Sequence, residues 1–110
     1  MNEFSNALSV SSSGLRAQSQ RLRHVAENIA NADTPGYRRK TVAFETDRGI
    51  GPDRAAGGVT PGPVQLDRSA LREVYDPAHP LADETGYYDG SNVNLMIEMA
   101  DAREAQRSYE

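Results

Sequence analysis

The chain has no cysteine and no tryptophan among its 110 residues, and it has no long hydrophobic run. Without cysteine, a disulfide, a thiolate metal site and a cysteine nucleophile are all excluded. No stretch approaches the roughly 18 apolar residues of a membrane-spanning helix, so membrane insertion is not expected. The N-terminus also lacks a basic region followed by an apolar core, so no cleavable secretory signal is predicted.

Large apolar residues are scarce as well. Seven leucines, seven valines, three isoleucines and two phenylalanines make up only 19 of the 110 residues. This is below the level of about a fifth at which a chain begins to look hard to fold alone. The net charge of −4 is nevertheless too small for a highly charged disordered chain. We therefore expect one small unit with extensions that completes its structure by packing against other subunits.

The N-terminal segment carries a heptad stripe. Leu8, Leu15, Leu22 and Ile29 lie seven residues apart, which predicts a helix from about residue 4 to residue 30. Six serines between residues 5 and 19, and a glycine among them, are poor helix formers. Since an isolated helix of this composition is marginal, we expect residues 1–30 to be largely disordered in the monomer and to fold on assembly.

A second stripe ends the chain. Alternating spacings of four and three separate Leu95, Met99, Ala102, Gln106 and Tyr109. This pattern predicts a helix over residues 92–110 with Asn92 as its N-cap. Two amphipathic ends of this kind predict that the N- and C-terminal helices pair as a coiled coil. The residues expected to make this helical packing are Leu8, Leu15, Leu22, Ile29, Leu95, Met99 and Tyr109.

A turn is predicted where the first helix ends. Pro35 disfavours helical geometry at Thr34, and the Pro35–Gly36 pair fits the central positions of a type II turn. Asparagine leaves helical geometry at low cost, and Tyr37 is then the first residue that leads elsewhere. The residues expected to set this turn are Asn28, Asn31, Thr34, Pro35, Gly36 and Tyr37.

The middle of the chain changes to short β-like runs. β-Branched and aromatic residues predict strands over residues 41–46, 64–67 and 71–75, with a mobile Gly/Pro-rich loop over residues 47–62. The expected fold class is therefore α+β, with two terminal helices and a small β-rich middle domain. The expected boundaries are 1–36 for the first helix and turn, 37–91 for the middle domain and 92–110 for the last helix.

Residues with catalytic or ligand chemistry are few. Asp76, His79 and Asp83 could bind a metal or act as acid and base, but the adjacent prolines and turn residues explain this segment structurally. The basic run Arg38-Arg39-Lys40 is too short for nucleic-acid binding on a net acidic chain. A solvated turn or an intersubunit salt bridge explains it better. No catalytic residue, metal site or cofactor is predicted.

Three motifs together resemble the flagellar rod and hook protein family. They are the stretch from Asn28 to Tyr37, the pattern Asp-Pro-x-His-Pro-Leu-Ala-Asp-x-x-Gly-Tyr over residues 76–87, and Asn-Val-Asn followed by Glu-Met in the last helix. Proximal rod members match better than hook members. The resemblance implies a structural subunit, and no enzyme, that polymerises into the tubular rod of the flagellar basal body and transmits torque.

The resemblance also implies a location and partners. Rod proteins are exported to the periplasm by the flagellar type III export apparatus without cleavage of a signal peptide. The implied partners are that apparatus, copies of the chain itself, other rod proteins, and the membrane-ring and rod-base proteins. The family helix continues past the Ser-Tyr-Glu motif, so the helix over residues 92–110 is expected to be truncated. Two alternatives stay open, namely a sister rod or hook protein and a secreted adaptor that docks its helices onto a partner.

Overall fold

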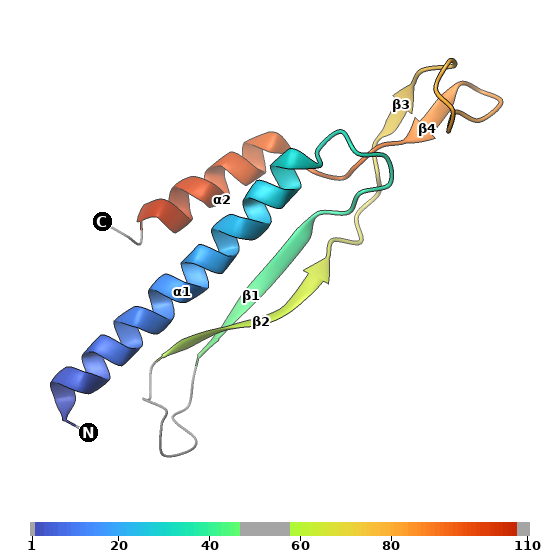
Figure 1. Ribbon diagram of the computed structural model, residues 1–110. Coiled ribbons are helices and arrows are strands. Elements are labelled where there is room, and N and C mark those ends of the chain that lie inside the picture. The colour runs from blue at the N-terminus through green and yellow to red at the C-terminus, as the bar shows by residue number, and fades with distance from the viewer. Residues whose placement is uncertain (1, 47–57, 108–110) are drawn as a thin grey trace.

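A computed structural model of the chain describes residues 2–46 and 58–107. It has an α+β composition, as predicted, with two helices and two small antiparallel sheets (Figure 1). In chain order the elements are α1 (Glu3–Ala30), β1 (Lys40–Thr46), β2 (Val59–Leu66), β3 (Glu73–Tyr75), β4 (Tyr87–Asp89) and α2 (Leu95–Arg107).

The arrangement is elongated, with overall dimensions of 66 × 28 × 16 Å. Helix α2 packs beside the second half of α1, and the β1–β2 hairpin runs along α1 (Figure 1). The β3–β4 ribbon projects from the end of the molecule where α1 finishes, far from the N-terminus (Figure 1). The two ends of the long axis therefore present different elements.

Helix α1 confirms the helix predicted over residues 4–30. It begins after Asn2, whose side-chain oxygen accepts a hydrogen bond from the Ser5 N–H at 2.8 Å, the usual role of an N-cap. It ends before the predicted turn, in which the Tyr37 N–H donates to the Thr34 carbonyl at 3.1 Å. Gly36 has φ +76°, a conformation that glycine adopts without steric cost.

The sheets differ in part from the predicted strands. Strand β2 starts at Val59, so the expected loop over residues 47–62 is wrong for residues 59–62, while 47–57 lie outside the described residues. The reason is register, because Thr46 pairs with Val59 and Phe44 with Pro61 in the antiparallel ladder. Proline is tolerated there because β2 pairs on one side only. The short strand β4, which pairs with β3, was not predicted.

The predicted N-cap of the last helix is also wrong. Helix α2 begins at Leu95, and the Asn94 side-chain oxygen accepts a hydrogen bond from the Met96 N–H at 2.9 Å. The Asn92 side chain is used elsewhere, because its oxygen accepts a hydrogen bond from the Arg39 N–H at 2.6 Å. A tertiary contact thus removes the capping residue that the sequence pattern favoured.

The core of the described residues is small and unusually polar. Its buried apolar side chains are Ala17, Val25, Ala32, Val93 and Ala105. The largest fully buried side chains are Glu98, Val93, Asn28 and Ser91, so three of the four are polar. Buried polar groups are costly unless they are hydrogen-bonded, so the fold depends on how these groups are paired.

Two glycines test the fold in opposite directions. Gly86 has φ +89°, and a Cβ there would lie 2.8 Å from Tyr75 Cε1, so Gly86→Ala should lower the free energy of unfolding by about 1–3 kcal/mol. Gly14 lies inside α1 with open space around it, so Gly14→Ala should raise that free energy by about 1 kcal/mol. Urea denaturation followed by circular dichroism measures both. A neutral Gly86→Ala would contradict the described ribbon geometry.

Candidate functional site

Asn28, near the end of α1, is the centre of a buried polar cluster. Its side chain is 1% exposed and uses all of its hydrogen-bonding capacity. The amide nitrogen donates to the Lys40 carbonyl at 3.0 Å and to Glu98 Oε2 at 3.2 Å. The amide oxygen accepts from the Tyr37 hydroxyl at 2.8 Å and from the Lys40 N–H at 2.9 Å. One side chain therefore joins α1, the turn, β1 and α2.

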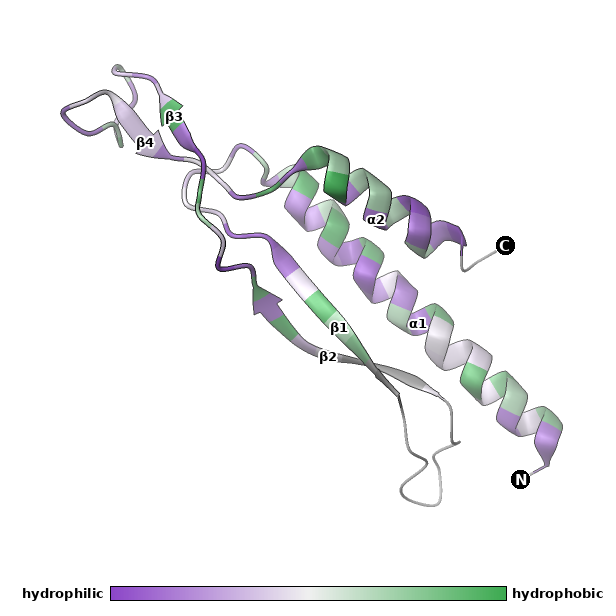
Figure 2. Cartoon of the chain, turned by 180° about the vertical axis from the view of Figure 1, so that it is seen from behind, coloured by the Kyte–Doolittle hydropathy of each residue, from purple (hydrophilic) through white to green (hydrophobic). Residues whose placement is uncertain are grey.

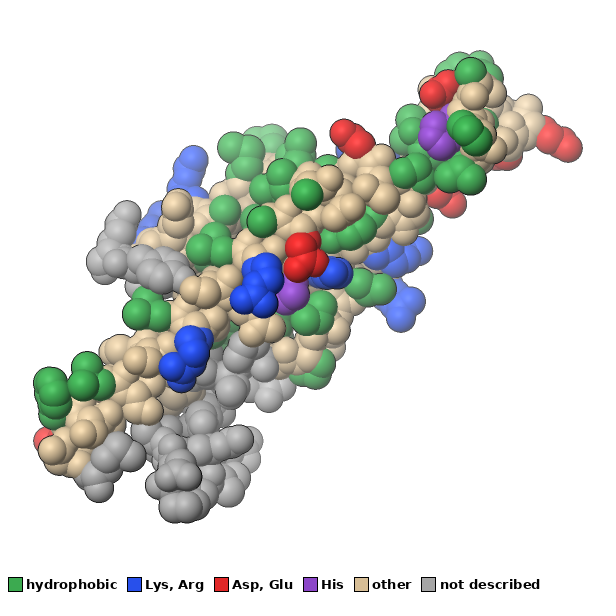
Figure 3. Space-filling model, viewed as in Figure 1, with side chains coloured by type: hydrophobic (Ala, Val, Ile, Leu, Met, Phe, Trp, Pro, Cys, Tyr) green, Lys and Arg blue, Asp and Glu red, His purple; other side chains and the backbone are tan. Residues whose placement is uncertain are grey.

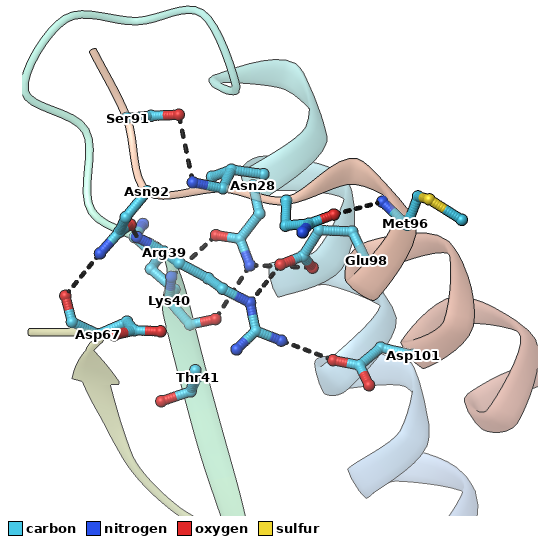
Figure 4. Close-up of polar contacts among 12 residues, drawn as sticks. Asn28, Arg39, Lys40, Thr41, Asp67, Ser91, Asn92, Met96, Glu98 and Asp101 are labelled. Atoms are coloured by element: carbon cyan, nitrogen blue, oxygen red, sulfur yellow. Dashed lines mark hydrogen bonds and ion pairs between the residues drawn. The ribbon is translucent and has the colours of Figure 1, made fainter. Parts of the chain in front are cut away.

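Glu98 on α2 is the charged member of this cluster. Its side chain has no exposed surface, and it accepts a hydrogen bond from Arg39 Nε as well as from Asn28 (Figure 4). Arg39 also donates to Asp101 Oδ2 at 2.7 Å. Burial opposes the charge of Arg39, but the hydrogen bond and charge of Glu98 outweigh it and raise the pKa of the guanidinium. The buried carboxylate is thus neutralised within the chain.

Further ion pairs extend the cluster along the helices. Arg21 on α1 lies 3.2 Å from Asp101 Oδ1 and 3.3 Å from Glu104 Oε2 on α2. Lys40 Nζ lies 2.5 Å from Glu27 Oε2. The hydrogen bond from Lys40 lowers the pKa of Glu27, and the same bond raises the pKa of Lys40. These pairs hold β1 and α2 against the same helix.

The turn is held from the other side by the segment that leads into α2. The Gly36 N–H donates to the carbonyls of Asp89 and Gly90 at 3.2 and 3.1 Å. The Ser91 hydroxyl donates to the Ala32 carbonyl at 2.5 Å. The Asn92 amide donates to the Asp67 carbonyl at 2.9 Å (Figure 4). The segment over residues 89–92 therefore clamps the turn to the rest of the fold.

The predicted turn residues differ in how deeply they enter this cluster. Asn28 and Tyr37 belong to it directly, and burial raises the pKa of the Tyr37 phenol. Asn31 bonds locally, since its amide donates to the Glu27 carbonyl at 2.9 Å and its oxygen accepts from the Thr34 hydroxyl at 3.1 Å. Pro35 and Gly36 form the tip of the turn and are exposed.

Most of the residues predicted to make the helical packing are exposed in the single chain. Between α1 and α2, Asn28 donates to Glu98, and Arg21 pairs with Asp101 and Glu104. Leu22 is half-buried. The other heptad residues lie on partly open faces, with exposed fractions of 54% for Leu8, 41% for Leu15, 42% for Ile29, 50% for Leu95 and 59% for Met99. Tyr109 lies outside the described residues. Their packing role stays a prediction.

Sequence reasoning missed the charged half of the cluster. The basic run at residues 38–40 was expected to be solvated or to reach another subunit, but Arg39 and Lys40 make ion pairs inside the chain. Arg38 donates to the carbonyls of Asp67 and Ser69 at 3.3 and 3.0 Å. A signal was present, because Glu98 is the single acid within the apolar run from Leu95 to Met99. A buried carboxylate at that position requires a cationic partner, because an unpaired buried charge is strongly destabilising.

The site has no arrangement suited to catalysis. A cleft of about 240 Å³ opens between α1, β1 and α2, and its charged lining residues are the ones already paired. In residues 2–46 and 58–107, no group of three acidic or histidine side chains could hold a metal. Within the same residues, no helix has the length and apolar character to cross a membrane.

Loss of Glu98 should cost much more than loss of a nearby surface acid. Glu98→Ala leaves the Arg39 guanidinium, 18% exposed, without its main partner, so the free energy of unfolding should fall by about 3–5 kcal/mol. Glu104→Ala is the matched control, because that side chain is 70% exposed and should cost less than about 1 kcal/mol. Urea denaturation compares the two. Equal losses would contradict the central role of Glu98.

The Glu27–Lys40 pair should give a measurable dependence on acid. Because the folded-state pKa of Glu27 lies below its ordinary 4.5, the pair contributes fully above that value and loses its contribution as pH falls through the folded-state pKa. Lys40→Met should therefore be less stable than the parent chain near neutral pH, with the difference shrinking in acid. Denaturation at about pH 7 and about pH 3 measures this. A difference that does not change with pH would refute it.

Comparison with known proteins agrees with this structural role. Residues 8–38 match the family described as "Flagella basal body rod protein", and residues 84–110 match "Flagellar basal body rod FlgEFG protein C-terminal". The flagellar basal-body rod protein FlgC of Agrobacterium fabrum is 48% identical over all of this chain and 83% of its own length. FlgC of Salmonella typhimurium is 39% identical over 96% of this chain and 81% of its own length. FlgC of Borreliella burgdorferi is 34% identical over 96% of this chain and 83% of its own length.

These similarities cover the helices, the turn and the segment that clamps it. The chain therefore belongs to the FlgC family of flagellar basal-body rod proteins, as a structural subunit and not an enzyme.

Proposed function

We propose that this chain polymerises through its terminal helices into the proximal part of the flagellar rod, the tubular shaft that transmits torque. The observation that carries the proposal is the burial pattern of α2, in which a charged side chain is buried and apolar side chains are exposed. On α2, Glu98 is completely buried, while Leu95, Met96, Ile97 and Met99 are 50, 80, 48 and 59% exposed. Figure 2 shows the hydrophobic stretch at the start of this helix. An exposed apolar patch of this kind marks a protein interface.

Helix α1 supports the same proposal from the other end of the chain. Its N-terminal half extends beyond the described end of α2 (Figure 1). Phe4 and Leu8 in this part are 71 and 54% exposed. Burying side chains of this size contributes about 1.5–3 kcal/mol each, so several such contacts per subunit would drive assembly.

We propose that these exposed faces form the coiled coil in the assembled rod. The residues proposed to pack there are Leu8, Leu15, Leu22, Ile29, Leu95, Met99 and Tyr109. In the single chain, polar contacts join the two helices, and Leu8, Leu95 and Met99 are exposed. Polar contacts would then stabilise the fold of one chain, and apolar contacts would join that chain to other copies.

The proposed units follow the same division. Residues 1–36 and 92–110 would supply the helical layer, and residues 37–91 would form the middle domain. The turn from Asn28 to Tyr37 would set the angle between them, because its hydrogen bonds reach both β1 and the segment before α2. Torque would then pass through many small interfaces on several neighbours.

The location and partners form part of this proposal. We place the assembled chain in the periplasmic rod of the basal body, after export by the flagellar type III apparatus without a cleaved signal peptide. Its partners would be copies of itself, other rod proteins, and the membrane-ring and rod-base proteins. The support is the family membership together with the exposed helical stripes.

Hydrogen exchange on the chain over a range of concentrations tests the proposal. The strands of the middle domain, β1 to β4, should be protected throughout, whereas residues 2–16 and the outer face of α2 should gain protection only on self-association. The variant Leu15→Ser with Met99→Ser should keep the protection of the middle and lose the concentration-dependent gain. The control Arg103→Ser changes an exposed residue outside the stripes and should behave as the parent. Full protection of α1 in a dilute monomer would contradict assembly-coupled ordering.

A further inference from the structure

One face of the β3–β4 ribbon carries an exposed pair of tyrosines. Tyr75 and Tyr87 are register partners, so their side chains share a face. Their ring centroids lie 5.0 Å apart with an edge-to-face angle of 61°, and the side chains remain 62 and 40% exposed. The Tyr75 ring sits directly over Gly86, where a Cβ would come within 2.8 Å of it. The aromatic surface is therefore held in place and uncovered.

The same face carries two carboxylates that oppose each other. Glu73 and Asp89 are register partners two residues from the tyrosines, and both are exposed. Like charges directly opposite on antiparallel strands are destabilising. Neither carboxylate has a salt bridge within residues 2–46 and 58–107. A cation placed between them would relieve this repulsion, and arginine would also stack on the tyrosine rings.

Charge along the chain points to a source of that arginine. Residues 73–89 contain five acidic residues and no lysine or arginine, whereas residues 4–26 contain three arginines and no acidic residue. Figure 3 shows acidic side chains without Lys or Arg at the projecting end, and Lys or Arg side chains along the helical body. The two segments are complementary in charge, and they lie on different elements, the β3–β4 ribbon and helix α1 (Figure 1).

Two of these arginines form a row on α1. Arg16 and Arg23 are both exposed and lie seven residues apart, which places them about 10 Å apart along one helical face. Exposed Ser12 and Ser19 share this face, and their small side chains allow close approach. Arg21 is already paired with α2. Glu27 lies one turn after Arg23, but its carboxylate is already paired with Lys40.

We propose that the ribbon face formed by Glu73, Tyr75, Tyr87 and Asp89 binds the Arg16–Arg23 row of a second copy of this chain. The contact joins two different surfaces of an elongated subunit, so it is heterologous and repeats from copy to copy into a ring or a filament instead of closing a two-fold dimer. This inference rests on the proposed rod function and adds a contact between copies to it, separate from the apolar helical stripes.

Cross-linking tests the contact directly, because the natural chain has no cysteine. Two differently tagged copies, Glu73→Cys and Arg16→Cys, are co-expressed in a flagellated strain that lacks its own copy of this subunit. Basal bodies are isolated and treated with a short bis-maleimide. A cross-linked dimer carrying both tags is expected. The matched control pairs Glu73→Cys with Arg103→Cys on α2 and should give no dimer. A product joining Glu73→Cys to a different basal-body protein, or equal products in both pairs, overturns the proposal.

Charge reversal separates this contact from a general effect on folding. Glu73→Arg with Asp89→Arg, and separately Arg16→Glu with Arg23→Glu, should each weaken self-association of the purified chain about tenfold. Mixing the two variants should restore it, with circular dichroism unchanged throughout. Unaltered association of either variant, or no recovery on mixing, overturns the proposal.

The outcomes also distinguish this inference from the proposed function. Reversed variants that enter basal bodies and associate like the parent would refute the ribbon contact and leave the rod function standing. A parent chain that never enters basal bodies would refute the rod function. The cross-link on the purified chain at high concentration would then still decide whether the ribbon binds α1.

Discussion

The buried hydrogen bond between Asn28 and Glu98 is the contact on which the rest of the structure depends. It joins α1 to α2, while the remaining capacity of the Asn28 side chain is used by Tyr37 and by both backbone groups of Lys40. Arg39 supplies the counter-charge. Every member of this cluster is satisfied, and a cluster left partly unsatisfied would be worse than an apolar core. The cluster can therefore specify one arrangement of helices in a chain that has few large apolar residues.

A polar interior has a direct consequence for the surface. The side chains that would normally fill a core, such as Leu8, Leu95 and Met99, are left on the outer faces of the helices. The fold of this structural rod subunit therefore does not consume these apolar side chains, which remain at its surface. Charge is also unevenly distributed, because the described part of α1 carries exposed arginines and the β3–β4 ribbon is acidic. The two elements therefore present surfaces of opposite charge.

The turn after α1 connects the helices to the β elements. Pro35 and Gly36 reverse the chain, and the segment over residues 89–92 clamps the turn through the carbonyls of Asp89, Gly90 and Ala32. Segments separated by more than fifty residues thus meet at one point. Force applied to the helices would reach the β elements through hydrogen bonds with defined geometry. The motifs shared with rod proteins lie on these segments.

Local chemistry determined much of this protein from the sequence alone. The leucine heptad specified helix α1, Pro35–Gly36 specified the turn, and three motifs, over residues 28–37, 76–87 and 92–99, together specified the family. These features depend on backbone preference and on residues close in the chain. The tertiary structure alone decided that Glu98 is buried, that Arg39 pairs with it, that Asn92 bonds to Arg39 instead of capping α2, and that residues 59–62 form a strand. Each of these depends on a partner far away in the sequence, and no local pattern encodes which distant group a polar side chain will meet.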